Sequence, residues 1–285
     1  MHLLANKKQQ DGAALLLVIM ITAIMSIIMT LMLHQSKLHM KLSSFVKHRA
    51  KAEMALQSAQ TRFVFQLMST PLHLVGPDYV SDTVIFERLV KNFKGELAAF
   101  DNVSVSVQDL GGLVSLLPLD IKSFNQLLIE QGYSSEELLA FHDRLADWQD
   151  GDSLTHLEGK EKGDYTGHPF FPSNVVLQSV NELSYLLEED VFQKIAPFLV
   201  LYGSGYMNRQ FTPEDLYSAA GIATNTNNKE YTSVSSAEGG HIFPSGRFLI
   251  RLSYTDNGVS LDKQFLLIRG LETFQPFFVA NEKIF

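Results

Sequence analysis

An uninterrupted apolar run near the N-terminus constrains this chain more than any other feature. Between Ala13 and Leu33 the only polar residues are Thr22, Ser26 and Thr30. As a helix these 21 residues are about 30 Å long, just enough to cross the hydrocarbon core of a bilayer. A secretory signal peptide has a shorter apolar core, followed by small residues at a cleavage site. Because this run leads into HQSKLHMKLSS without such a site, a retained membrane anchor is favoured over a discarded signal.

The segment that follows the run, residues 34–69, continues the helix. It contains neither glycine nor proline, and apolar residues such as Leu38 and Phe65 recur at loosely helical spacing. Pro71 then stops the helix. The pattern predicts one helix over residues 13–69, with a lipid-facing first half and an amphipathic second half.

Basic residues on the two sides of the apolar run create a conflict over membrane orientation. Two lysines precede the run, whereas five basic residues follow it. The positive-inside rule, applied as a simple count, would place the N-terminus outside. The conflict is softened if the continued helix presents its basic face to lipid headgroups or to partner helices. The residues are Lys7 and Lys8 before the run, and Lys37, Lys41, Lys47, Arg49 and Lys51 after it.

Composition and motifs argue against several functions. The net charge of −8 argues against nucleic acid as a partner, because phosphate binding needs a basic surface. The absence of cysteine removes disulfides, thiolate nucleophiles and cysteine-type zinc sites. The motifs G-x-S-x-G, H-E-x-x-H and G-x-x-x-x-G-K-[ST] are missing. Packing or surface roles are favoured for the scattered histidines, including His142 and His156. We therefore expect no enzymatic activity.

The chain beyond the N-terminal helix predicts a mixture of helices and strands. Valines alternate with polar residues over 103–107 as in a half-buried strand, and a turn follows at 109–112. Helices are predicted over 120–132 and 134–148, and the segment 179–200 reads as two shorter helices. The apolar runs on both sides of TDNG predict a C-terminal hairpin that closes an antiparallel sheet with the first strand.

Residues 143–164 are the most chemically loaded stretch of the chain. They hold seven carboxylates against three basic side chains, and such crowding is unfavourable unless solvent or a cation screens it. Oxygen-rich side chains along a glycine-containing loop suit Ca²⁺, which takes six to eight oxygen ligands. The loop is not an EF-hand, because Leu154 and Thr155 stand where that motif needs an oxygen ligand and a turn glycine. The charge pattern alone leaves a calcium site and a solvated acidic loop both open.

The N-terminus resembles the leader of type IV prepilins, since a short lysine-containing segment ends at Gly12 and Ala13 begins the apolar helix. In that family a membrane peptidase cleaves after the glycine, so the resemblance implies processing between Gly12 and Ala13, with methylation. Most members carry a glutamate at the fifth mature position, where this chain has Leu17. The minor pseudopilin K of type II secretion characteristically lacks that glutamate. A carboxylate in lipid needs a partner, so a subunit without one suits a position with no subunit ahead of it.

The acidic stretch carries the most specific resemblance, which is to the same K-type pseudopilins. It contains A-D-W-x-D-x-D and G-x-E-x-x-x-Y segments, and a Pro/Asn loop that leads to S-V-x-E-L. In that family the loop binds calcium and stabilises a helical domain; Lys162 departs from the pattern, because an acidic residue commonly stands there. The matching positions include Ala146, Asp147, Trp148, Asp150, Asp152, Gly159, Glu161, Tyr165, Ser179, Val180, Glu182 and Leu183. The resemblance implies calcium as the cofactor, with the candidate ligands Asp150, Asp152, Glu158, Glu161 and Asp164.

The resemblance also implies the organisation of the chain. The expected fold class is α+β, with a pilin-like long N-terminal helix packed on an antiparallel β-sheet and a large inserted α-helical domain. The implied segments are the leader (1–12), the transmembrane (13–33) and amphipathic (34–69) halves of the helix, the first part of the pilin-like domain (70–108), the inserted domain with the acidic loop (109–222) and the C-terminal strands (223–285).

The implied function is that of a minor pseudopilin at the tip of the type II secretion pseudopilus. It would assemble with other minor pseudopilins to initiate and cap the filament that drives export of folded proteins. Further implied partners are the prepilin peptidase and the inner-membrane secretion platform. The implied location is the inner membrane, crossed once, with the C-terminal domain in the periplasm. Two alternatives stay open: a membrane-anchored periplasmic calcium-dependent hydrolase, and a minor pilin of a type IV pilus.

Overall fold

The computed structural model describes residues 5–77, 90–100, 102–203, 205–221, 243–256, 258–272 and 275–285. The first four residues of the predicted leader, Asn257 of the predicted hairpin turn and the start of the predicted C-terminal segment lie outside these ranges. The chain divides into two compact units. The first comprises residues 1–54 and 255–261, and the second comprises residues 55–254 and 262–285.

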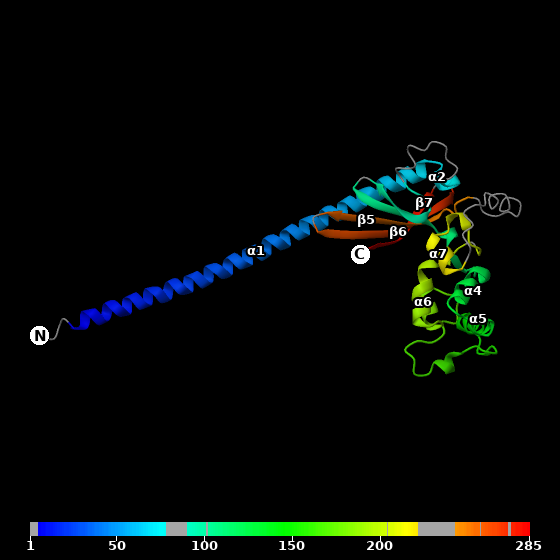
Figure 1. Ribbon diagram of the computed structural model, residues 1–285, viewed down its shortest axis with the longest axis horizontal. Coiled ribbons are helices and arrows are strands. Elements are labelled where there is room, and N and C mark those ends of the chain that lie inside the picture. Colours follow the sequence, from blue (N-terminus) through cyan, green and yellow to red (C-terminus); the bar gives the residue numbers. More distant parts are fainter. Residues whose placement is uncertain are drawn as a thin grey trace. The chain divides into compact units, whose positions relative to one another are not determined.

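Helix α1 (Ala5–Ser69) confirms the predicted long N-terminal helix and begins within the leader (Figure 1). Among the described residues it is the one helix long and apolar enough to cross a membrane, with a mean hydropathy of 2.7 and no burial in its most apolar window. Two of its polar side chains bond within the helix: Thr22 Oγ1 donates to the Ile19 carbonyl at 2.9 Å, and Thr30 Oγ1 to the Ser26 carbonyl at 2.8 Å. Such internal bonds suit a helix surrounded by hydrocarbon.

The C-terminal part of α1 has a buried apolar face in the second unit. Leu56, Phe63 and Leu67 are fully buried, and their spacing of seven and four residues places them on one side of a helix. The Phe63 ring meets the Phe100 ring edge-on, with 5.5 Å between centroids. Burial of one such aromatic side chain stabilises the fold by about 2–3 kcal/mol. This face explains why the second half of the helix is amphipathic.

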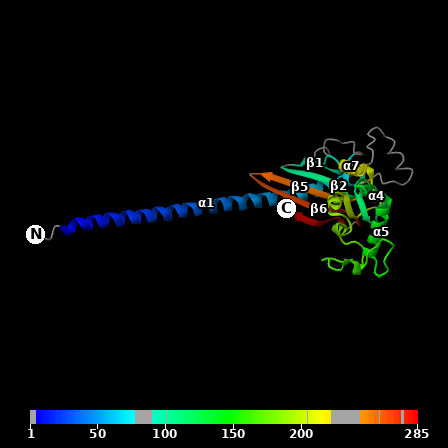
Figure 2. The ribbon, with the colours of Figure 1, turned by 60° about the horizontal axis from the view of Figure 1, so that its bottom comes forward.

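The main sheet has five strands in the order β1-β2-β5-β6-β7, and the strand pairs β1–β2, β2–β5 and β6–β7 are antiparallel. Strands β5 and β6 form the predicted hairpin, which Figure 2 shows beside β1 and β2. The C-terminal strand β7 was not predicted. The bounds are β1 (Lys94–Phe100), β2 (Val103–Asp109), β5 (Arg247–Asp256), β6 (Val259–Glu272) and β7 (Gln275–Ile284).

A large insertion interrupts this sheet between β2 and β5. Asp109 at the end of β2 pairs with Phe248 in β5, so the chain leaves and re-enters the sheet at the same place. The inserted helices cluster together in Figure 1 around a core that includes the fully buried Phe124 and Phe141. They are α4 (Ile121–Glu130), α5 (Ser135–Gln149), α6 (Glu189–Ile195) and α7 (Glu214–Ala219).

The insertion also contains a pair of short strands. β3 (Val114–Leu117) and β4 (Leu199–Tyr202) pair in parallel. The segment predicted as two short helices forms a 3₁₀ helix, η4 (Val180–Tyr185), then α6, then a 3₁₀ turn, η5 (Ala196–Phe198). The prediction was therefore wrong for the last residues of that segment, where the chain turns from helix into β4.

A buried carboxylate joins the two chain segments at which the insertion begins and ends. Asp109 is fully buried; its Oδ1 accepts a hydrogen bond from the Gly111 backbone at 2.6 Å, and its Oδ2 accepts one from the Ser245 backbone at 2.7 Å. Burial raises the pKa of Asp109 to about 6, although these hydrogen bonds favour the ionised form. Next to it, a Cβ on Gly112 would lie 2.1 Å from the Phe211 carbonyl oxygen, so only glycine fits there.

Candidate metal centre

Helix α5 brings negative charge to its own C-terminal end. A capping box fixes its start: Ser134 Oγ accepts from the Glu137 backbone at 3.3 Å, and Glu137 Oε2 accepts from the Ser134 backbone at 2.8 Å. The helix ends at Gln149, and the next residue, Asp150, caps it with an N–H that donates to the Ala146 carbonyl at 2.9 Å. Its last turn holds Asp147 and no basic residue, although a helix C-terminus favours cations. A bound cation would relieve this arrangement.

Three of the five predicted ligands come together in space. Asp150, Asp152 and Glu161 each place a carboxylate oxygen within 4.8 Å of the others. A second, overlapping group consists of Asp147, Asp150 and His156, whose ligand atoms also lie within 4.8 Å of one another. Asp147 and Glu161 are buried, whereas Asp152 is exposed, so the cluster has a buried floor and an open side.

Two oxygens of this cluster are buried without a hydrogen-bond partner among the described residues: Asp150 Oδ1 and Glu161 Oε1. An unpaired buried carboxylate oxygen is costly, because it has given up water without a replacement. Burial raises the pKa of Glu161, and the charges of Asp147, Asp150 and then Asp152 raise it further. Both observations describe neighbouring carboxylates, of which Asp150 and Glu161 each have a buried oxygen without a partner among the described residues.

Asp147 is the residue that the predicted ligand set left out. Its carboxylate is fully buried and accepts from the His156 backbone N–H at 3.2 and 3.3 Å, and the His156 ring Nδ1 contacts it as well. This contact raises the pKa of the His156 imidazole. A Cβ on Gly159 would lie 1.8 Å from Asp147 Oδ2, so glycine at that position admits the carboxylate. Asp147 and Gly159 both belong to the motifs quoted from the sequence, and their presence there was the signal that could have included Asp147 in the site.

Glu158 and Asp164, the other predicted ligands, belong to neither group. Glu158 is exposed, and its backbone N–H donates to Asp143 Oδ2 at 3.1 Å. Asp164 Oδ2 accepts from the Glu161 backbone N–H at 2.9 Å, which holds the chain at Glu161 in place. Metal binding by these two residues stays a prediction.

An aromatic cluster around Trp148 packs next to the acidic residues. Trp148 Nε1 donates to Glu182 Oε2 at 2.9 Å, and Glu182 Oε1 accepts from the backbone of Ser179 at 2.9 Å. The Trp148 ring meets Tyr165 edge-on at 5.9 Å and stacks on Tyr185 at 5.7 Å, measured between centroids. Residues of all three quoted motifs therefore meet in one place, although they are spread over more than 30 positions.

The remaining candidate residues lie elsewhere. His142 Nε2 lies 2.7 Å from Asn125 Oδ1, and burial lowers the pKa of His142, as expected for a packed histidine. Gly12, Ala13 and Leu17 all belong to α1, and the Leu17 side chain is exposed. Their roles in processing and in tip position stay predictions.

The donor set favours one class of metal. Carboxylate oxygens dominate it, the chain has no thiol, and an open side remains for water or carbonyl ligands. Hard oxygen donors in irregular geometry suit Ca²⁺, whereas Mg²⁺ demands a near-ideal octahedron. The residues present therefore fit a calcium ion.

Comparison with known proteins relates this part of the chain to a family. Residues 86–204, which include the acidic stretch and the aromatic cluster, match the family model described as type II secretion system (T2SS), protein K. A search of curated proteins gave no match. One similar solved chain comes from the crystal structure of the GspK-GspI-GspJ complex of the type 2 secretion system of enterotoxigenic Escherichia coli. The likeness has 15% identity and a TM-score of 0.50, and it covers 84% of this chain and 97% of that chain. At that identity it supports the fold.

Proposed function

Because residues 86–204 match the family model of type II secretion system protein K, we propose that this chain is the minor pseudopilin at the tip of the pseudopilus. There it would initiate and cap the filament that drives export of folded proteins. The observation that carries this proposal is the insertion between the paired residues Asp109 and Phe248. It adds a helical body at one place on a pilin-like sheet, where a further subunit would otherwise stack.

Leu17 supports the same position. A charged fifth residue inside lipid needs a partner on the subunit ahead, and a tip subunit has none. The uncharged Leu17 avoids this cost. The apolar helix α1 fits a single-pass anchor, and we propose that it lies in the inner membrane after cleavage between Gly12 and Ala13, with the C-terminal domain in the periplasm.

The proposed partners are other minor pseudopilins. The similar solved chain was crystallised in a complex of GspK, GspI and GspJ, and we propose an equivalent complex for this chain. The prepilin peptidase would process the leader, and the inner-membrane platform would receive the assembled tip. A membrane-anchored hydrolase and a type IV minor pilin receive no support from the family match.

Calcium is the proposed cofactor, with Asp150, Asp152 and Glu161 as ligands and Asp147 as their buried neighbour. The unpaired oxygens Asp150 Oδ1 and Glu161 Oε1 support this assignment. A bound calcium ion would supply the positive charge that stabilises the loop. The chain's own part is to hold the carboxylates together through α5 and through the bond between Trp148 and Glu182.

The tip position can be tested with two glutamate variants. In a secretion strain that lacks its own K protein, Leu17→Glu and the control Leu16→Glu each bury one carboxylate in the apolar helix. A tip subunit offers neither carboxylate a partner, so both variants should reduce assembly with the other minor pseudopilins to a similar degree. The proposal is contradicted if Leu17→Glu assembles as the original chain does while Leu16→Glu fails, because position 17 would then face a subunit ahead.

A further inference from the structure

The basic residues that follow the apolar run remain without a role in the function above. From Gly12 to Ala52 the sequence contains no aspartate or glutamate, and the first carboxylate after the run is Glu53. Arg49 Nε bonds to Glu53 Oε1 at 3.1 Å, and Lys51 Nζ bonds to Asp256 Oδ2 at 2.8 Å. The lysines nearest to the apolar run, Lys37 and Lys41, therefore have no carboxylate close to them in the sequence.

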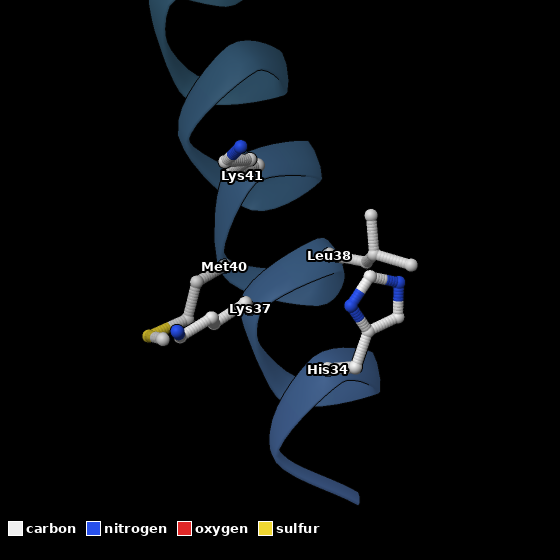
Figure 3. A pocket seen from close by; sticks show the side chains of 5 residues that line it. All are labelled: His34, Lys37, Leu38, Met40 and Lys41. Carbon is white, nitrogen blue, oxygen red and sulfur yellow. The ribbon is translucent and has the colours of Figure 1, made fainter. Parts of the chain in front are cut away.

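Lys37, Lys41 and Lys47 make no ion pair with any residue that the structure describes. Lys37 and Lys41 line an open hollow of about 300 Å³ on the side of α1. Figure 3 shows Lys37 beside Met40, His34 beside Leu38, and Lys41 one turn further along. Because all five lining residues belong to one helix, the hollow is a surface feature that can receive a group from outside the chain.

The position of these lysines along the helix selects the partner. If residues 13–33 fill the hydrocarbon core, Lys37 lies about 6 Å beyond its edge and Lys41 about 12 Å beyond. The polar headgroup layer is about 5–8 Å thick on each side of the core. Lys37 thus lies at headgroup depth, and the flexible stem of Lys41 can reach back to it. Lys47, about 21 Å beyond the edge, lies clear of the layer.

We propose that Lys37 and Lys41, with the hollow between His34 and Lys41, bind the headgroup of an anionic phospholipid. The phosphate and its negative charge complement the two ammonium groups, and Leu38 and Met40 line the same hollow. This inference needs only that α1 spans a membrane, and it holds whether or not the chain caps a filament. It also relieves the conflict with the positive-inside rule, because headgroup phosphates neutralise the lysines beyond the run.

The test uses the full-length chain in bilayers of equal parts phosphatidylglycerol and phosphatidylcholine. The chain is extracted in mild detergent, and the lipids that it retains are identified and counted by native mass spectrometry. A lysine at a membrane surface favours anionic lipid by about fivefold. Retained phosphatidylglycerol should exceed phosphatidylcholine at least fivefold, and Lys37→Gln/Lys41→Gln should lower that ratio to about one.

The matched control is Lys47→Gln/Arg49→Gln, which removes two positive charges from the same helix beyond the headgroup layer. It should keep the original ratio, and circular dichroism should show that both variants stay helical. The proposal is overturned if the original chain shows no preference for phosphatidylglycerol, as expected if these lysines serve acidic partner helices instead. It is also overturned if both double variants lose the preference equally, or if neither does.

Discussion

Removal of calcium should lower the thermal unfolding midpoint of this chain, and Glu161→Gln should remove the dependence on calcium. Without a cation, Asp150 and Glu161 each keep a buried oxygen that lacks a partner among the described residues. Three carboxylates within 4.8 Å of one another also repel each other. If, as we propose, calcium binds this arrangement, it does so only in the folded state, so that its binding free energy would add to stability.

The expected size of the effect follows from mass action. At a free calcium concentration 100 times the dissociation constant, the gain is about 2.7 kcal/mol. For a chain of about 150–250 folded residues, each kcal/mol shifts the midpoint by about 2–4 °C. Addition of a chelator should therefore lower the midpoint by about 5–11 °C.

The variant should behave in opposite ways with and without calcium. Because the folded state raises the pKa of Glu161, its contribution to stability is present below the unfolded pKa and is lost as the pH rises through the folded pKa. In chelator, at a pH above the folded-state pKa of Glu161, the ionised carboxylate destabilises the original chain. Glu161→Gln should then melt at a higher temperature than the original chain in chelator, yet gain nothing from calcium.

The assay is differential scanning calorimetry of the full chain in nanodiscs, with calcium or with chelator. Glu158→Gln is the matched control, because it removes the same charge from an exposed residue outside both acidic groups. This control should keep the full calcium shift. Equal midpoints with and without calcium in the original chain would refute the reasoning, as would a calcium shift that survives in Glu161→Gln.

Three further predictions concern the framework around the site. Trp148→Phe keeps an aromatic ring but loses the hydrogen bond to Glu182, so it should lower the free energy of unfolding by about 1.5–3 kcal/mol. Urea titrations followed by far-ultraviolet circular dichroism measure this loss, and a value below about 0.5 kcal/mol would contradict the prediction. The pKa of Asp109 is raised to about 6, so its contribution to stability should be present below pH 3.8 and lost as the pH rises through 6. In urea titrations across this range the free energy of unfolding should fall less for Asp109→Asn than for the original chain, and an equal fall would count against the raised pKa of Asp109. Gly112→Ala should destabilise the fold by about 3 kcal/mol in the same titration. Gly151→Ala, where a Cβ meets nothing within 4 Å, should cost about 0.5 kcal/mol or less. Similar losses in both variants would show that the backbone at Gly112 shifts to relieve the close approach.

The sequence predicts those elements whose cause is local. Helix α1 is long and uninterrupted, and the capping box at Ser134 fixes the start of α5. Strand β7 was missed because Pro276 within its apolar run argues against a strand. The structure places β7 at the edge of the sheet, where a strand tolerates proline. Strand β4 has four residues and pairs in parallel with the distant β3, a contact that no local pattern encodes.

The same distinction between local and distant causes explains the candidate site. Charge density is a local property, so the sequence located the acidic stretch. Which carboxylates share a site depends on the fold: Asp147 is buried because the last turn of α5 faces Gly159, whereas Glu158 next to that glycine is exposed. No spacing rule separates the two, because the loop between them is irregular.

The three motifs in the acidic stretch form one structural unit. Trp148 follows the buried Asp147 and precedes Asp150 by two residues, and its indole is held by Glu182 from the third motif. Tyr165, from the second motif, packs edge-on against the same indole. A displacement of Trp148 would therefore move the end of α5, and with it the acidic cluster. We therefore expect the aromatic residues of the motif to matter for the proposed metal site, because they hold the backbone from which the carboxylates extend.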